Sequence, residues 1–206
     1  MTVLIATEGL RVRYGARTVL DGVTVEIRAG DVLALTGRSG SGKTTLLLAL
    51  AGLLPPSGGT VRIGDRRELA YVPQAPSLVP ELTALENVLL AMRLRGTVPE
   101  VAEERARREL AALELTEAAD ALPHELSGGM AQRTALARAL ALDAAVLLVD
   151  EPTGSLDRAT GARVLALLTA RATGGTALVL ATHDREVSDR LPRRLHLREG
   201  QLEEAA

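Results

Sequence analysis

The residues from Gly37 to Thr45, GRSGSGKTT, have types and spacing that point directly to chemistry. They match the pattern G-x-x-x-x-G-K-[ST], in which glycines let backbone N–H groups wrap around phosphates at the start of a helix. Lys43 is the one lysine among 24 lysine and arginine residues. A compact point charge on a flexible stem suits this place better than a planar guanidinium. The loop therefore predicts a nucleoside-phosphate site, where Lys43 reaches the β- and γ-phosphates and Thr44 holds Mg²⁺.

The alternative is a glycine-rich turn that only begins a helix. It is disfavoured because the loop lies between a predicted buried strand, residues 31–37, and a predicted helix that begins at Thr44 and is ended by Gly52. The predicted phosphate-binding residues of the loop are Gly37, Ser39, Gly40, Ser41, Gly42, Lys43, Thr44 and Thr45.

A pair of acidic residues follows a second apolar run, in AVLLVDEPTGSLD. A buried strand that ends at Asp150 brings one carboxylate to the Mg²⁺ side of a phosphate site. Glu151 comes directly after it, where a carboxylate can polarise an attacking water. Taken alone, the pair fits a solvated turn as well as it fits catalysis.

A second glycine pair occurs in ELSGGMAQRTALARAL. Ser127, Gly128 and Gly129 stand at the start of a predicted helix, where bare N–H groups and a hydroxyl can bind an anion. Two such phosphate-type helix starts in one chain are unusual.

Composition narrows the class of protein. The net charge is −2, the arginines are interleaved with acids, and aromatic residues are limited to two tyrosines, so a nucleic-acid surface is not expected. No cysteine is present, which excludes disulfides, cysteine-ligated zinc and thiol catalysis. The longest apolar run, residues 46–54, is far short of the roughly 20 residues that cross a bilayer. We expect a cytoplasmic protein that does not itself enter the membrane.

Apolar strands alternate with helices along the chain. This order predicts an α/β fold with a mostly parallel sheet covered on both faces. Further strands are predicted at 23–27, 145–150 and 176–182, and further helices at 83–94, 99–113, about 131–142 and 159–172. Thr83 and Glu86 have the spacing of a capping box.

The sequence resembles the nucleotide-binding subunit of an ABC transporter, and the resemblance covers nearly the whole chain. Besides the phosphate loop and Asp150–Glu151, its motifs stand in the family's order: YVPQ with Gln74, LSGG, SLD with Asp157, and ATHD with His183. One departure is Met130, where the family usually has glutamine after LSGG. The motif sequences most resemble those of bacterial lipoprotein-releasing and macrolide- or peptide-exporter subunits.

The resemblance implies a role for each motif residue. Tyr14 would stack on adenine, Glu151 would be the general base, and His183 would contact the γ-phosphate. Gln74 would touch Mg²⁺ or the attacking water, joining Thr44 and Asp150 as metal ligands, and Asp157 would contribute to the nucleotide site. Tyr14 as a strand-edge residue and His183 as an incidental histidine are the alternatives. His124 and His196 match no motif and are interpreted as structural.

The resemblance also implies an architecture and partners. It is a P-loop NTPase fold with a mostly parallel core sheet, an N-terminal antiparallel β subdomain, and an α-helical subdomain at about 80–140 that carries LSGG. Residues 1–206 would form a single ATP-binding domain. Two copies, or this chain and a related subunit, would share ATP across their interface. A separate integral membrane permease would hold the pair on the cytoplasmic face of the cell membrane.

The function implied is ATP hydrolysis that powers transport by the permease as the dimer closes and opens. The alternative is an ABC ATPase that regulates an extracytoplasmic process through a few-span membrane partner. A soluble P-loop kinase leaves LSGG and His183 unexplained, and a chromosome ATPase requires a coiled-coil insertion that 206 residues do not contain. Cargo and transport direction stay open.

Overall fold

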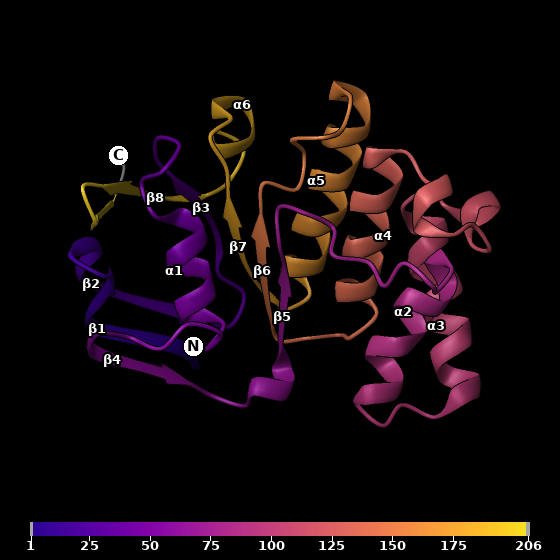
Figure 1. Ribbon diagram of the computed structural model, residues 1–206, viewed down its shortest axis with the longest axis horizontal. Coiled ribbons are helices and arrows are strands. Elements are labelled where there is room, and N and C mark those ends of the chain that lie inside the picture. Colours follow the sequence, from indigo (N-terminus) through magenta and orange to yellow (C-terminus); the bar gives the residue numbers. More distant parts are fainter. Residues whose placement is uncertain (1, 205–206) are drawn as a thin grey trace. The chain divides into compact units, whose positions relative to one another are not determined.

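The computed structural model describes residues 2–204, which form two compact units (Figure 1). The core unit comprises residues up to 71, residues 145–151, and residues from 168 onward. The helical unit comprises residues 72–144 and 152–167. Each unit is described separately below.

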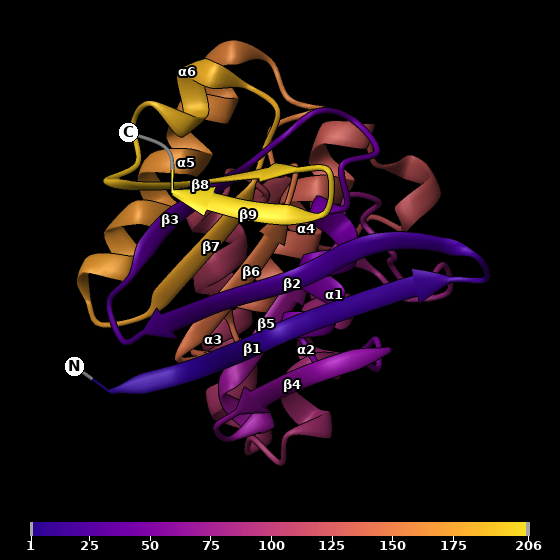
Figure 2. The same cartoon turned by 90° about the vertical axis from the view of Figure 1, so that its left-hand side faces the viewer.

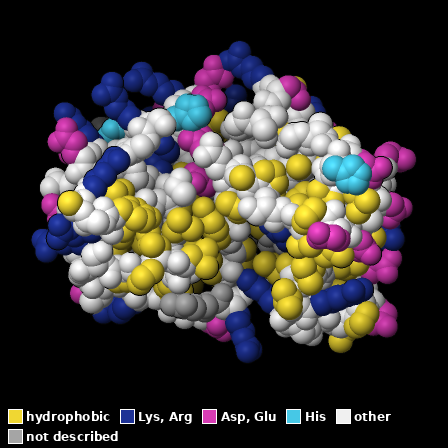
Figure 3. All heavy atoms as spheres, in the orientation of Figure 1, with side chains coloured by type: hydrophobic (Ala, Val, Ile, Leu, Met, Phe, Trp, Pro, Cys, Tyr) yellow, Lys and Arg dark blue, Asp and Glu magenta, His cyan; other side chains and the backbone are white. Residues whose placement is uncertain are grey.

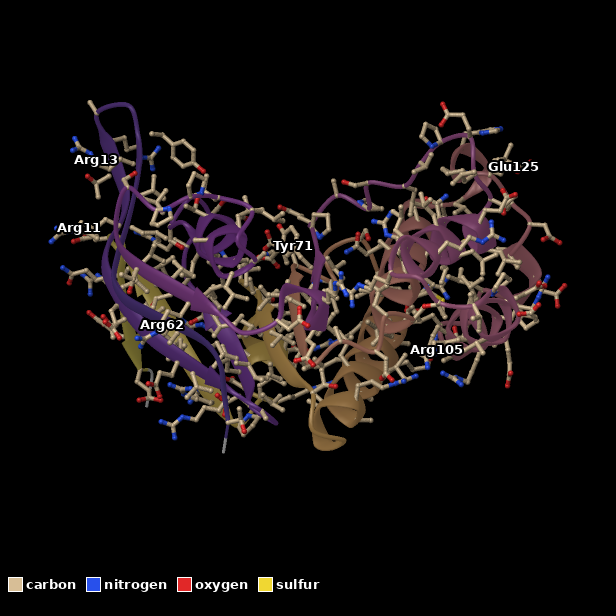
Figure 4. All side chains as sticks on the ribbon, turned by 90° about the horizontal axis from the view of Figure 1, so that it is seen from below. Arg11, Arg13, Arg62, Tyr71, Arg105 and Glu125 are labelled. Atoms are coloured by element: carbon tan, nitrogen blue, oxygen red, sulfur yellow. The ribbon has the colours of Figure 1, made fainter. Side chains whose placement is uncertain are left out.

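The core unit contains a three-stranded antiparallel sheet, visible in the foreground of Figure 2. Its strand order is β2-β1-β4, with β1 at Val3–Tyr14, β2 at Arg17–Arg28 and β4 at Gly58–Ile63. Buried and exposed residues alternate along much of β2, as expected for a sheet with one solvated face. Exposed arginines such as Arg11 project from this sheet into solvent (Figure 4), and Arg11 pairs with Asp21 at 3.0 Å. This pairing fits the interleaved charges of the sequence.

The core unit also contains a six-stranded sheet, in the order β5-β6-β7-β3-β8-β9. Strands β6, β7, β3 and β8 run parallel, whereas β9 is antiparallel to β8. The central strands β6 and β7 are buried along their whole length, because they consist of unbroken apolar runs up to Asp150 and Ala181. The bounds are β3 Val32–Thr36, β5 Leu69–Val72, β6 Val146–Asp150, β7 Ala177–Ala181, β8 Arg193–Arg198 and β9 Gln201–Glu204.

The pairing register aligns the carboxyl ends of the parallel strands. Asp150 pairs with Ala181, and Thr36 pairs with His196. Ligands of open α/β sheets bind at this edge, where the loops after neighbouring strands meet. Helix α1, Lys43–Leu50, starts here after the glycine loop, and the short helix α6, Arg185–Ser188, follows β7. Leucines of α1 join one apolar core with residues of both sheets.

The helical unit is built on three helices that pack against one another: α2 at Ala84–Leu94, α3 at Pro99–Ala112 and α4 at Gly128–Leu140. The expected capping box at the start of α2 is confirmed, because Thr83 and Glu86 each bond the other's backbone N–H. Helix α5, Arg158–Thr173, has its residues up to 167 in this unit. Single turns of 3₁₀ helix occur at Arg66–Glu68, Thr116–Ala118 and Pro123–Glu125.

The predicted α/β class, parallel sheet and antiparallel sheet are confirmed. The predicted start of the strand at 23–27 was wrong, because this stretch is the last part of β2, which begins at Arg17. The expected end of the first helix at Gly52 is confirmed: α1 ends at Leu50, and Gly52 has φ of 67°, a left-handed conformation that ends the helix.

Candidate nucleotide site

The glycine loop after β3 contains two positions, Gly37 and Gly42, at which a side chain would clash with neighbouring strands. Gly37 has φ of 151°, and a Cβ there would lie 2.6 Å from the carbonyl oxygen of Leu197. Gly42 has φ of 105°, and its Cβ would lie 2.9 Å from Cγ1 of Val19. Larger residues would push the loop off β8 and β2, so the glycines keep the N–H groups at the start of α1 accessible.

Lys43 begins α1, and its side chain is buried inside the loop. Its Nζ donates to the carbonyl oxygen of Gly37 at 3.0 Å and to that of Arg38 at 3.4 Å. The same nitrogen lies 3.9 Å from Oε1 of Glu151. The Lys43 ammonium is thus held inside the loop by two carbonyl oxygens, with the Glu151 carboxylate nearby.

Thr44 and Asp150 are joined directly. The Thr44 hydroxyl donates to Oδ2 of Asp150 at 2.6 Å. Burial raises the pKa of the Asp150 carboxyl, the bond from Thr44 lowers it, and the charge of Glu151 raises it further. A hydroxyl and a carboxylate are the hard oxygen donors that suit Mg²⁺, which takes one or two protein ligands and completes its shell with substrate phosphates and water. The residues present therefore fit that ion.

The described residues contain no cluster of three or more histidine, cysteine or acidic side chains placed to bind a metal by themselves. An ion held here would need oxygens from the nucleotide as well. Tyr71 of β5 (Figure 4) is electrostatically coupled to the same carboxylate: burial first, and the charge of Asp150 second, raise the pKa of Tyr71 to about 12. Its hydroxyl therefore stays protonated at neutral pH.

Glu151 has a left-handed backbone, with φ of 48°. This conformation is unfavourable for a non-glycine residue, and it persists because the Glu151 N–H donates to the carbonyl oxygen of Ala181 at 2.9 Å. Its carboxylate is 2.8 Å from Nδ1 of His183, which follows β7. An ionised carboxylate only accepts hydrogen bonds, so Nδ1 carries the proton in this pair. Loops after β6 and β7 thus bring an acid and an imidazole together beside Lys43.

Other predicted residues of the core unit are also accessible. Tyr14 is 52% exposed at the end of β1, next to the turn into β2, so its ring is available for stacking. Ser39 and Gly40 are exposed, and Thr45 is half-buried on α1. The Ser41 hydroxyl is buried and has no hydrogen-bond partner among residues 2–204, which leaves it available to a phosphate oxygen.

The LSGG segment starts α4 in the helical unit. Ser127 caps the helix, since its hydroxyl accepts from the N–H of Met130 at 3.2 Å. Gly128 is exposed with open space around it, whereas a Cβ on Gly129 would lie 3.2 Å from Leu156. Asp157 caps α5 by accepting from the N–H groups of Ala159 and Thr160. Hydrogen bonding to the Thr160 side chain first, and these backbone bonds next, lower the pKa of Asp157.

Gln74 lies exposed in the loop after β5, and two residues that the sequence analysis missed hold this loop in the helical unit. Arg138 of α4 donates to the carbonyl oxygens of Pro76 and Ser77, both at 3.0 Å. Asn87 of α2 is fully buried and bonds the backbone of Val79 on both its N–H and its carbonyl. No local pattern signals either role, because each depends on contacts between separate segments.

Comparisons with known proteins agree with this geometry. The family model described as "ABC transporter" matches residues 20–154. The chain is 44% identical to the lipoprotein-releasing system ATP-binding protein LolD of Gluconobacter oxydans, over 95% of this chain and 93% of that one. It is 40% identical to LolD of Chromohalobacter salexigens, over 92% and 86% respectively. It is also 38% identical to the pyoverdine export ATP-binding/permease protein PvdT of Pseudomonas aeruginosa, of which the alignment covers 33%.

The fold is likewise shared with solved structures. A dimeric post-hydrolysis state of the ATP-binding cassette MJ0796, bound to ADP and Pi, superposes with a TM-score of 0.90 at 32% identity over 98% of both chains. A second dimeric structure of MJ0796 gives 0.89 at 33% identity over 97% of both. No helix within residues 2–204 combines the length and apolar character that a membrane span requires. This chain belongs to the ABC transporter family, as an ATP-binding subunit that hydrolyses ATP.

Proposed function

We propose that this protein is the ATPase subunit of an exporter that releases lipoproteins from the membrane, working with a separately encoded permease. The ATPase part rests on the convergence of Lys43, Asp150, Glu151 and His183 at one edge of the sheet. The cargo part is supported by the LolD relatives, which match over nearly their whole length. Relatives with a fused permease match over only a third of theirs.

The proposed binding roles follow from the contacts. Lys43 exchanges its two loop carbonyls for the β- and γ-phosphates, the loop N–H groups bind the remaining phosphate oxygens, and Tyr14 stacks on adenine. Thr44 and Asp150 hold Mg²⁺, with Gln74 as a further ligand. When bound, Mg²⁺ neutralises charge that develops on the phosphate oxygens.

The proposed catalytic roles rest on Glu151 and His183. Glu151 accepts a proton from the attacking water, because its carboxyl group is buried and lies next to the phosphate loop. His183 donates through Nδ1 to that carboxylate, which fixes its direction. Oriented in this way, the imidazole positions the γ-phosphate.

We further infer that residues 1–206 act as one ATP-binding domain and that two subunits close around ATP. Ser127, Gly128 and Gly129 of one copy would complete the ATP site of the other, with Asp157 at the same interface. The exposed Ser127 and Gly128 support this assignment, because nothing in their own chain covers them among the described residues. ATP bound by both copies would stabilise only the closed dimer.

The permease would dock on the helical unit, around Gln74 and the helix from Thr83 to Leu94, and would keep the chain on the cytoplasmic face of the membrane. Leu94 supports this surface, since it is 80% exposed. Charge reversal at Glu81 and Glu86 is then expected to weaken recruitment to membranes more than ATP binding. Unchanged recruitment would place the interface elsewhere.

The test of this function is a purification from native membranes. Tagged Glu151→Gln protein, expected to hold ATP without hydrolysing it, is solubilised with ATP and Mg²⁺, and co-purifying proteins are identified by mass spectrometry. We expect a many-span permease together with lipoprotein. A few-span partner with a large outer domain would favour the regulatory alternative. Ser127→Arg protein, in which the closed dimer should not form, is the control and should retain less lipoprotein.

A further inference from the structure

A second concave surface of the core unit lies beside the glycine loop. This surface, called here the basic cavity, has a volume of about 480 Å³, within the range of roughly 300–1,000 Å³ typical of small-ligand sites. Its lining combines the start of the loop with residues that follow β7 and belong to β8. The ionisable side chains of the lining are Arg38, His183, Arg185, Asp189, Arg194 and His196.

The charge of this lining is strongly one-sided. Asp189 is its one acidic residue, and it is paired with Arg194 at 2.6 Å. The charges of Arg38 and Arg185 are therefore not balanced by any acid in the lining. Arginine and histidine side chains gather over α6 and β8 at the upper left of Figure 3, and basic residues continue into a neighbouring cavity of about 590 Å³ that shares Arg38 and His196. Planar guanidinium groups bind oxyanions through paired hydrogen bonds.

His196 is oriented by a hydrogen bond from the same cavity wall. The Thr36 hydroxyl donates to the carbonyl oxygen of Leu195 at 3.1 Å, so it is left as an acceptor for Nδ1 of His196 at 3.0 Å. The proton of this imidazole is thereby placed on Nδ1, which leaves Nε2 as a hydrogen-bond acceptor for a protonated oxygen such as the hydroxyl of hydrogen phosphate. His196, interpreted from the sequence as structural, is thus also part of the cavity lining.

The basic cavity adjoins the catalytic groups. His183 lines it and is hydrogen-bonded to Glu151. Gly37 lines it as well, and the carbonyl of Gly37 accepts from Lys43. The cavity is therefore next to the end of the loop where the γ-phosphate is bonded to Lys43 in the proposed site. The surplus of positive charge in the cavity therefore lies beside the γ-phosphate position of the proposed site.

We propose that the basic cavity is a second oxyanion subsite, which binds the orthophosphate produced by hydrolysis. The inference rests on the ATPase function, in which water adds to the γ-phosphorus, the bond to ADP breaks, and orthophosphate and a proton are released. Phosphate occupies this subsite while the nucleotide site is still filled. It therefore slows turnover without competing with ATP.

The direct test is equilibrium dialysis of radiolabelled orthophosphate against protein saturated with Mg²⁺ and a non-hydrolysable ATP analogue, so that the γ-phosphate position is filled. We expect one phosphate per chain. Arg185→Gln should weaken this binding about tenfold, as expected for loss of a charged hydrogen-bond donor. Arg190→Gln is the matched control, because Arg190 is an exposed arginine of the same segment outside the cavity lining. Arg190→Gln should leave the phosphate affinity unchanged.

Absence of phosphate binding to the analogue-loaded protein would overturn the proposal, and so would equal weakening by both variants. Steady-state kinetics give a second readout: phosphate should lower kcat at saturating ATP in the parent and in Arg190→Gln, and much less in Arg185→Gln. Vesicles containing anionic lipid are the last arm. Loss of vesicle binding in Arg185→Gln with unchanged phosphate affinity would assign the cavity to lipid headgroups instead. If the proposed ATPase function were wrong, the parental protein would not hydrolyse ATP in the kinetic assay. That result differs from every outcome above, all of which concern phosphate or vesicle binding.

Discussion

The carboxylate of Glu151 accepts a hydrogen bond from Nδ1 of His183 over 2.8 Å, and the same oxygen lies 3.9 Å from Nζ of Lys43. Replacing Glu151 by glutamine keeps the size of this side chain and its ability to accept from His183, but removes its capacity to take a proton. We expect hydrolysis to fall by about 10²-fold or more, with the affinity for ATP retained. Phosphate release and calorimetric ATP binding measure the two effects. Parental turnover in Glu151→Gln would exclude it as the base.

The trapped state should be visible in solution. Glu151→Gln protein is expected to sediment as a monomer without nucleotide and largely as a dimer with ATP, because shared ATP stabilises only the closed pair. Ser127→Arg introduced into this variant should abolish the shift, since a bulky cation would occupy the exposed start of α4. Circular dichroism should show the Ser127→Arg chain to be folded. Profiles that ignore ATP would count against the dimer model.

The single lysine permits a chemical test of the loop. An acyl-phosphate ATP probe should acylate Lys43 and, at most, the N-terminal amine, because no other side-chain amine exists in the chain. Excess ATP with Mg²⁺ should protect Lys43, and Lys43→Ala should abolish nucleotide binding or hydrolysis. Peptide mass spectrometry locates the label. Labelling of Lys43 at an undiminished rate in the presence of ATP would place the nucleotide elsewhere.

Asp150, a proposed Mg²⁺ ligand, should lower the stability of the folded protein without nucleotide. Burial raises its pKa in the folded state above the ordinary value of 3.8, so the folded protein holds this proton more tightly than the unfolded chain. The free energy of unfolding therefore falls as pH rises from the ordinary value of 3.8 through the higher pKa of the folded state. This loss of stability persists at neutral pH. We expect Asp150→Asn to melt at a higher temperature than the parent at pH 7, with the difference shrinking as pH falls toward 3.8. ATP with Mg²⁺ should stabilise the parent only.

Arg138 should control the order of the loop that carries Gln74. Its guanidinium binds two loop carbonyls, and burial lowers its pKa. Arg138→Leu leaves both carbonyls without this donor, so hydrogen exchange at residues 75–79 should accelerate. Arg108→Leu, at an exposed arginine of α3, is the control and should not alter that loop. Unchanged exchange in Arg138→Leu would show that Asn87 alone is sufficient.

The elements that the sequence predicted best are those whose position depends on local signals. Glycine spacing located the loop at Gly37–Gly42, and unbroken apolar runs located β6 and β7, because a strand buried on both faces requires apolar residues throughout. The strands β1, β4, β5, β8 and β9 were not predicted. Of these, β4 and β9 are short, largely exposed and held by pairing with neighbours, so their side chains carry little periodic signal.

In the candidate site, too, local sequence signals located some residues, whereas contacts between separate segments could not be predicted. Residue types and order made Lys43, Asp150 and Glu151 candidates, whereas the 2.8 Å pairing of Glu151 with His183 depends on the register of β6 with β7. Arg138 could not be distinguished from the other arginines of the sequence. Its partners, Pro76 and Ser77, lie more than sixty positions away along the chain.

The left-handed backbone of Glu151 has a consequence for the evolution and engineering of this protein. Glycine adopts that conformation without steric penalty, so Glu151→Gly would relieve strain of order 1–3 kcal/mol. A search for thermostable variants that ignored activity would therefore tend to select glycine here and discard the proposed base. We expect selection for turnover to keep glutamate at this position although glycine would relieve the strain. Sequence libraries sorted first by melting temperature and then by ATPase rate should show opposite preferences at position 151.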